Sequence, residues 1–293
     1  ALEEIVGIAA EYRHSRVAAH STTLRPPPPL YPSSCTPRGA EVSFGLSRTN
    51  TTVSVSTSEL PLSALRAMAN GYDVPSWAAT MRARIASEMR AHGGIAIIDD
   101  FLPRAVAEEL RDVLLELEPD KWRPNVDHGE TYDTPHTFFS CTENISDVTR
   151  ILSSLMPTKM PLFSAARYTE GHSIARHNDA RNTSDGCGGV LYRDTAIVLY
   201  LVDDWKKEDG GLFLDYGVRG PDRRAGDIER SHADADTVEP LQTVVPTFNR
   251  LVVFDVPRDH EVTRVTVRDN TVRPRLSIFG WFLRKFVFED LIF

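Results

Sequence analysis

His177 and Asp179 stand two residues apart, and His260 and Arg275 follow much later in the chain. Two histidines and one carboxylate form the three-ligand face that suits non-haem Fe(II), and this face leaves the opposite coordination positions open. Residues two apart in an extended segment point to the same side, so the sequence predicts that His177 and Asp179 share one strand edge. A distant strand would then supply His260. Because any chain that contains histidines can show this pattern by chance, its meaning depends on the sequence around it.

The segments around these residues are predicted to be strands. Each is a short run rich in apolar residues and bounded by charged or turn-forming residues. The runs cover residues 162–168, 195–202, 209–216, 248–254 and 275–282. In the third run, Gly210 and Gly211 form a tight turn that needs positive φ. Many short strands separated by turns favour a sandwich or a barrel.

The chain before these strands has helical periodicity. A short helix over residues 62–69 is predicted to end near Gly71. A second helix carries an apolar residue at every fourth position and ends at two glycines. A strand follows over 95–99, and Pro103 then opens a third helix. The apolar positions of the second helix are Trp77, Met81, Ile85 and Met89, and those of the third are Val106, Leu110, Val113, Leu114 and Leu117.

Several segments carry a resemblance to a known family. They read ARYTEGHSIARHNDA, LYLVDDW, DGGLFLDY, FNRLVVFDV, DHEVTRV and RLSIFGWF, in the family's order. Over roughly residues 90–283 the chain resembles the prolyl-hydroxylase branch of the Fe(II)/2-oxoglutarate dioxygenases, and within it the catalytic domain of the ribosomal prolyl hydroxylases. The resemblance implies a mainly β fold with supporting helices, in which a jelly-roll or cupin-like double-stranded β-helix follows the helices.

The resemblance also implies roles for individual residues. His177, Asp179 and His260 match the iron ligands of the family. Arg275 matches the residue that holds the distal carboxylate of 2-oxoglutarate, and a guanidinium suits this role because it can donate two parallel hydrogen bonds to a carboxylate. Tyr200 matches a phenol that supports the same carboxylate, and Tyr168 matches a tyrosine that lines the cosubstrate pocket. Residues 121–147 are interpreted as a loop-rich stretch with a few packing aromatics, which in the family would border the substrate groove.

The function that the resemblance implies is protein prolyl hydroxylation. The cofactors would be Fe(II), O₂ and 2-oxoglutarate, with ascorbate as reductant, and the products would include succinate and CO₂. The substrate would be a protein with a target proline, for which a ribosomal protein is a candidate. Two alternatives stay open: a structural or accessory subunit of a larger assembly that retains the fold, and an oxygenase that acts on a small metabolite.

Composition excludes several other classes of protein. The chain has 33 basic and 41 acidic residues and a net charge of −8, which argues against a nucleic-acid surface. No apolar run is long enough to span a membrane. Cys35, Cys141 and Cys187 are isolated, so neither a disulfide framework nor a zinc site is indicated. We therefore expect a reducing intracellular compartment, with the cytoplasm or nucleus favoured over an organelle.

The two ends of the chain differ from its centre. Residues 1–60 are predicted to form an extended arm that contains Pro, Ser, Thr and Arg, because its proline run favours a polyproline conformation. Residues 61–293 are predicted to be the dioxygenase domain, with its barrel core at about 160–283. The apolar segment 286–293 would be a last strand or a docking site, and with the arm it could bind a larger protein assembly.

A second HxD pattern occurs at residues 232–234, and a related His-Gly-Glu at residues 128–130. Both stand in polar sequence without the apolar strands that frame His177. We interpret both as surface loops.

Overall fold

The computed structural model describes residues 63–71, 74–129, 134–185, 189–218, 238–267 and 274–285. Every described residue belongs to one compact unit, Val55–Phe293. The predicted arm, the HxD at 232–234 and the segment 286–293 lie outside the described residues. So does Glu130 of the polar pattern at 128–130, although His128 lies in a bend, as predicted.

Four α-helices of the described residues precede or interrupt the strands. They are α2 (Ala64–Asn70), α3 (Val74–Ala91), α4 (Arg104–Leu115) and α5 (Ser146–Ser153). The Ser63 side chain caps α2 by accepting a hydrogen bond from the Arg66 amide, and α2 ends at Gly71, as predicted. None of the helices in the described part of the chain is long and apolar enough to cross a bilayer.

The strands form one curled antiparallel sheet in the order β1-β10-β7-β12-β4-β3-β5-β11-β8-β9, with β2 paired to β3 and β6 paired to β7. Their bounds are β1 (Ile95–Ile98), β2 (Arg123–Asp127), β3 (His136–Cys141), β4 (Met160–Tyr168), β5 (Ser173–His177), β6 (Asn182–Ser184), β7 (Val190–Tyr200), β8 (Phe213–Gly217), β9 (Gln242–Val244), β10 (Leu251–Asp255), β11 (Asp259–Val262) and β12 (Arg275–Lys285). Two 3₁₀ turns, η1 (Pro119–Lys121) and η2 (Lys207–Asp209), complete the described elements.

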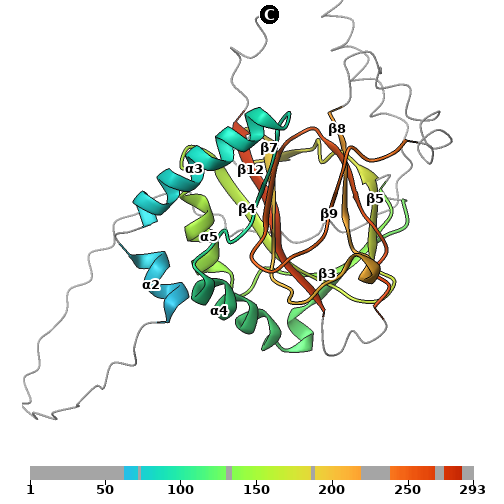
Figure 1. Ribbon diagram of the computed structural model, residues 1–293, viewed down its shortest axis with the longest axis horizontal. Helices are drawn as coiled ribbons and strands as arrows, with labels where there is room; N and C mark the ends of the chain where they lie inside the picture. Colours follow the sequence, from blue (N-terminus) through green and yellow to red (C-terminus); the bar gives the residue numbers. More distant parts are fainter. Residues whose placement is uncertain are drawn as a thin grey trace, which may run out of the picture. The chain divides into compact units, whose positions relative to one another are not determined.

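The sheet has two walls. We call β1, β10, β7, β12 and β4 the first wall, and β5, β11, β8 and β9 the second wall; β3 pairs with β4 of the first and with β5 of the second. The helices lie on the outer side of the first wall, and the second wall lies on the other side of the barrel (Figure 1). The predicted fold, a mainly β double-stranded β-helix with supporting helices, is confirmed.

Strand β7 shows how one sequence serves two packed layers. Ile197 and Leu199 belong to the core between the first wall and the helices. Ala196 and Tyr200, at alternate positions, belong to a separate cluster inside the barrel that also contains Phe213 of β8. Because side chains of a strand alternate between its two faces, a strand buried on both sides is apolar at nearly every position. This explains the continuous apolar run in the sequence.

The interpretation of residues 121–147 as loop-rich was wrong. This stretch contains β2 and β3, and β3 joins the two walls. Strand β2 includes Pro124, Asn125 and Asp127, residue types that are depleted in strands. Within the described residues β2 pairs only with β3, and a proline is tolerated at such an edge. Pairing with β3 therefore overrides the local preference of this sequence.

Candidate active site

The three predicted ligand side chains converge inside the barrel. His177 of β5 and His260 of β11 are directly opposite in the antiparallel ladder, and their ring centroids are 4.2 Å apart. The Nε2 atom of His177 lies 3.4 Å from Asp179 Oδ1, and the Nε2 atom of His260 lies 3.5 Å from Asp179 Oδ2. One ligand atom from each of the three residues lies within 4.8 Å of the others, a spacing at which all three can touch one ion.

Asp179 reaches this position through a turn. Strand β5 ends at His177, and Asp179 has a φ of 63°, in the left-handed region. Aspartate is one of the few residues besides glycine that visit this region. The prediction that His177 and Asp179 share one extended strand edge was therefore wrong. The left-handed turn places the Asp179 carboxylate beside both imidazoles.

The imidazoles are oriented by backbone carbonyls. His177 Nδ1 lies 2.9 Å from the Ala175 carbonyl oxygen, and His260 Nδ1 lies 2.7 Å from the Arg258 carbonyl oxygen. A carbonyl oxygen can only accept, so each Nδ1 carries the proton and donates it. In the neutral form of each ring, Nε2 then presents a lone pair toward Asp179, and this is the tautomer that a metal ligand needs.

Burial and local charge favour the same protonation states. Burial, with a contribution from the neighbouring His177, lowers the pKa of His260 from 6.5 to about 4. Burial alone would raise the pKa of Asp179, but interactions with His177, His260 and Arg193 outweigh it and hold that pKa below its usual range. The site therefore offers a carboxylate and a neutral imidazole at His260, which together suit a divalent cation.

Arg275, the first residue of β12, is a buried cation between two aromatic rings. Its side chain is 1% exposed, and its guanidinium carbon lies 4.4 Å from the Tyr168 ring centroid and 5.0 Å from that of Tyr200. Among the described residues no carboxylate forms an ion pair with Arg275, and its Nε has no hydrogen-bond partner. A buried guanidinium without an anion is costly, so this arrangement fits an anionic ligand.

The two phenols next to Arg275 can donate hydrogen bonds to such an anion. Burial raises the pKa of Tyr168 and of Tyr200, and the positive charge of Arg275 only partly opposes this effect. Both hydroxyls therefore keep their protons. Tyr200 Oη is buried and has no hydrogen-bond partner within the described residues. The predicted residues Arg275, Tyr200 and Tyr168 thus lie together, and because their donors suit an anion we call them the anion-binding cluster.

The anion-binding cluster and the triad face the same interior. Tyr200 packs in the inner cluster with Phe213 and Phe254. The rings of these two phenylalanines contact the ring of His260, with centroids 5.2 Å and 4.7 Å from it. A small dicarboxylate held by Arg275 would therefore extend toward the triad. The two imidazoles and the carboxylate of the triad fit Fe(II). The unpartnered Arg275 Nε and Tyr200 Oη fit 2-oxoglutarate.

Three residues that the sequence analysis did not assign to the site contact it. Arg193 Nη1 lies 3.3 Å from Asp179 Oδ1, and its guanidinium carbon lies 3.4 Å from the Trp281 ring centroid. Phe138 stacks on Tyr168, with centroids 5.3 Å apart. Strand alternation could have indicated Trp281, because it lies six residues from Arg275 on the same strand and so on the same face. No comparable signal marks Arg193 or Phe138.

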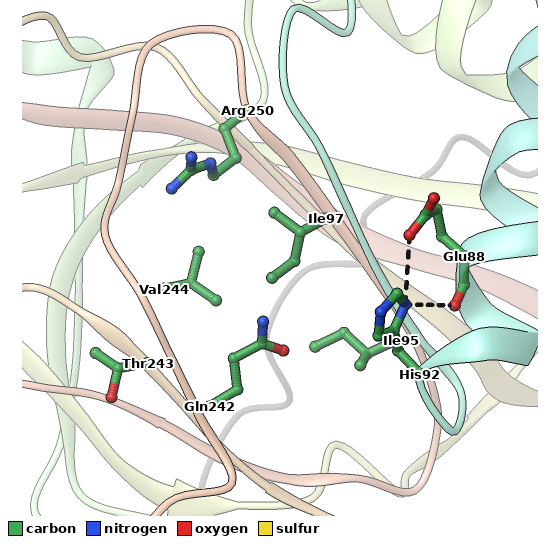
Figure 2. Close-up of a pocket in the computed structure, with 8 residues that line it drawn as sticks. All are labelled: Glu88, His92, Ile95, Ile97, Gln242, Thr243, Val244 and Arg250. Atoms are coloured by element: carbon green, nitrogen blue, oxygen red, sulfur yellow. Dashed lines mark hydrogen bonds and ion pairs between the residues drawn. The ribbon is translucent and has the colours of Figure 1, made fainter.

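A cavity of about 350 Å³ lies elsewhere in the barrel. It is lined by Ile95 and Ile97 of β1 and by the three residues of β9, with Glu88, His92 and Arg250 around them (Figure 2). Strands β1 and β9 are the two ends of the strand order, so the cavity lies where the barrel does not close. None of its lining residues belongs to the triad or to the anion-binding cluster, so it is distinct from the candidate active site.

The match to one family model agrees with this geometry. Residues 163–283 match the model of the 2OG-Fe(II) oxygenase superfamily. Comparison with curated proteins gave no match. Similar solved structures include a Pseudomonas putida prolyl-4-hydroxylase, at 22% identity, with 70% of this chain and 99% of that chain covered and a TM-score of 0.47. They also include a prolyl hydroxylase from Trichoplax adhaerens in complex with a hypoxia inducible factor oxygen degradation domain peptide fragment, at 17% identity, with 73% and 94% covered and a TM-score of 0.47.

A viral collagen prolyl hydroxylase from Paramecium bursaria Chlorella virus-1 is also similar, at 17% identity, with 64% of this chain and 95% of that chain covered and a TM-score of 0.36. The assignment of the family does not depend on these three structures. It depends on the matched segment, which contains the His-Asp-His triad and Arg275. Residues 163–283, which hold the triad and Arg275, therefore match the 2OG-Fe(II) oxygenase superfamily.

Proposed function

We propose that this chain is a protein prolyl hydroxylase. It would insert one oxygen atom of O₂ into a C–H bond of a proline residue and the other into 2-oxoglutarate, which leaves as succinate and CO₂. The observation that carries the proposal is the stacked pair of Arg193 and Trp281 next to Asp179. Together with the family's sequence segments around the triad, this pair suits a proline in a peptide backbone.

The residues of the domain divide the chemistry between them. His177 and His260 would hold the iron through Nε2, and Asp179 would hold it through its carboxylate. Arg275, Tyr200 and Tyr168 would bind the distal carboxylate of 2-oxoglutarate with charge-assisted hydrogen bonds. Bound together, Fe(II) and 2-oxoglutarate supply the oxidation of a C–H bond by O₂.

The Arg193–Trp281 pair supports a peptide substrate. The face of an indole packs well against the C–H groups of a pyrrolidine ring, and a guanidinium donates hydrogen bonds to a peptide carbonyl. Trp281 is partly exposed, and its Nε1 is buried without a hydrogen-bond partner within the described residues. A ligand beside the triad could therefore pack against this stacked pair on the first wall.

The test is hydroxylation of peptides by the purified, Fe(II)-loaded chain. We expect proline-containing peptides to gain one oxygen atom by mass spectrometry and to increase succinate release, while the same peptides with Pro→Ala do neither. The His177→Ala variant controls for oxidation that does not depend on the triad. Succinate release that responds to free amino acids or metabolites but to no peptide would contradict the proposal. Failure to bind Fe(II) and 2-oxoglutarate would instead favour an accessory subunit.

Three finer parts of the proposal come from the sequence resemblance. These are a ribosomal protein as substrate, ascorbate as reductant, and a reducing intracellular compartment. The first predicts that a peptide set covering small-subunit ribosomal proteins contains a sequence that the chain hydroxylates. The second predicts that ascorbate sustains succinate release over many turnovers, whereas a thiol reductant at equal concentration sustains it less well.

A further inference from the structure

Arg258 lies just before β11, and its side chain is fixed in a buried ion pair. Nε and Nη2 lie 2.6 Å and 2.7 Å from the two carboxylate oxygens of Asp215 on β8. Nη1 donates to the Gly93 carbonyl at 2.7 Å. Arg258 and Asp215 are only 4% and 1% exposed. The side chain therefore has little freedom, and its main chain is held with it.

The main chain of Arg258 contacts both parts of the triad. Its carbonyl accepts the hydrogen bond from His260 Nδ1 at 2.7 Å. Its amide donates to the carbonyl of Asn178 at 3.3 Å, and Asn178 is the residue between His177 and Asp179. The carbonyl of Arg258 therefore orients the His260 imidazole, and its amide holds the turn that connects His177 to Asp179.

Stability alone does not account for this ion pair. A buried ion pair is often no more stabilising than apolar side chains of similar volume, although removal of one partner is harmful because a charge is left unpaired. We propose that the Asp215–Arg258 pair is a positioning device for the metal site, which sets the location of the Arg258 peptide groups and through them the spacing of His177, Asp179 and His260. This inference rests on the metal site of the proposed function.

The expected effect is on metal affinity. Loss of the outer partners of metal ligands typically weakens metal binding 10–100-fold. A merely structural ion pair would lower the thermal stability and leave the metal affinity of the folded protein unchanged. Metal affinity and apo-protein melting temperature, measured on the same variants, therefore separate the two roles.

The first variant removes both charges together. The double substitution Asp215→Leu and Arg258→Met leaves no unpaired charge, so it is the replacement with the best prospect of folding. Arg258→Lys is the milder second variant. Lysine keeps the positive charge but lacks the planar guanidinium that bonds both carboxylate oxygens and the Gly93 carbonyl at once. Arg111→Ala is the matched control: Arg111 forms an ion pair with Asp203 away from the triad.

The measurement is titration of metal-free protein with Co(II), followed by the visible absorption of the bound ion, beside thermal melting. Wild-type protein is titrated first, so a failure of the metal site itself is recognised at this step. We expect weaker Co(II) binding, roughly 10–100-fold in the double variant and less in Arg258→Lys, with an altered absorption spectrum and no change in Arg111→Ala. Wild-type affinity and spectrum in Arg258→Lys, or in a folded double variant, would overturn the inference.

Discussion

Arg275 Cδ lies in the space beside Gly211 that a side chain would need: a Cβ on Gly211 would be 2.8 Å from it. Gly211 also has a φ of 60°, which glycine adopts without strain. The sequence explains this glycine only as part of a tight turn. The structure gives it a second role, because the absence of a Cβ leaves room for the guanidinium of the anion-binding cluster.

Gly211→Ala is expected to weaken 2-oxoglutarate binding by displacing Arg275. Gly171→Ala is a control, because Gly171 also has a positive φ, of 85°, and a Cβ there would meet no atom closer than 3.8 Å. Both variants carry backbone strain of a similar size, roughly 1–2 kcal/mol of stability. Calorimetric titration of the metal-loaded proteins should show weaker binding, by about 10-fold for a displacement that costs about 1.4 kcal/mol, only in Gly211→Ala. Equal affinities in the two variants would show that Arg275 accommodates the methyl group.

Arg275→Lys is expected to reduce 2-oxoglutarate affinity by roughly 10–100-fold. Lysine keeps the positive charge but cannot form two parallel bonds to a carboxylate, and a hydrogen bond to a charged group contributes about 1.5–3 kcal/mol. Titration with 2-oxoglutarate measures this loss. Titration with Co(II) alone should give the wild-type affinity, because the triad belongs to other strands. A parallel loss of Co(II) affinity would show that the substitution disturbs the whole site.

Tyr200→Phe is expected to change stability and binding in opposite directions. Tyr200 Oη is buried without a partner, and such a group costs roughly 1–3 kcal/mol, so its removal should raise the free energy of unfolding of the ligand-free protein. The same change removes a donor to 2-oxoglutarate and should weaken its binding by about 3–10-fold. Chemical denaturation and calorimetry measure the two effects. Tyr216→Phe removes a phenol outside the anion-binding cluster and should leave 2-oxoglutarate affinity unchanged.

The metal-free protein is expected to lose stability as the pH is lowered from about 6.5 to about 4. These two values are the ordinary pKa of histidine and the pKa of His260 in the folded protein. In this window the unfolded chain binds a proton at His260 that the folded chain does not, so acid favours unfolding. Above about 6.5 this contribution to stability is fully present, and below about 4 it is lost. The slope from this one group is at most about 1.4 kcal/mol per pH unit.

Denaturation of metal-free wild-type and His260→Gln protein across this range measures that contribution. Glutamine does not titrate, so the variant should show the shallower dependence. Identical slopes would assign the acid sensitivity to other groups.

The sequence predicted the parts of the site that have local signals. His177, Asp179 and Arg275 stand beside apolar runs that predict strands. The apolar face of α3 around Ile85 packs on the first wall, as expected. The strand β3 was missed because its few residues, HTFFSC, lack the strict alternation of apolar and polar residues that predicts a strand. Its place in the sheet depends on β4 and β5, which are distant in sequence.

The contacts between distant residues could not be predicted for a similar reason. Asp215 and Arg258 are 43 positions apart, and no periodicity links them. Asp179 was placed on a strand edge because its left-handed turn is a tertiary outcome that a two-residue spacing does not reveal. Patterns over a few neighbouring residues predict individual helices and strands. The pairing of buried charges depends instead on the closed barrel, which brings distant residues together.

Within the described residues, the ladder passes from one wall to the other through β3. Arg275 and Tyr200 belong to the first wall, and His177 and His260 belong to the second. The residues suited to a dicarboxylate and those suited to an ion therefore come from different walls, and they meet only where β3 joins both walls in one barrel. Assembly of the candidate active site thus requires the whole barrel and neither wall alone.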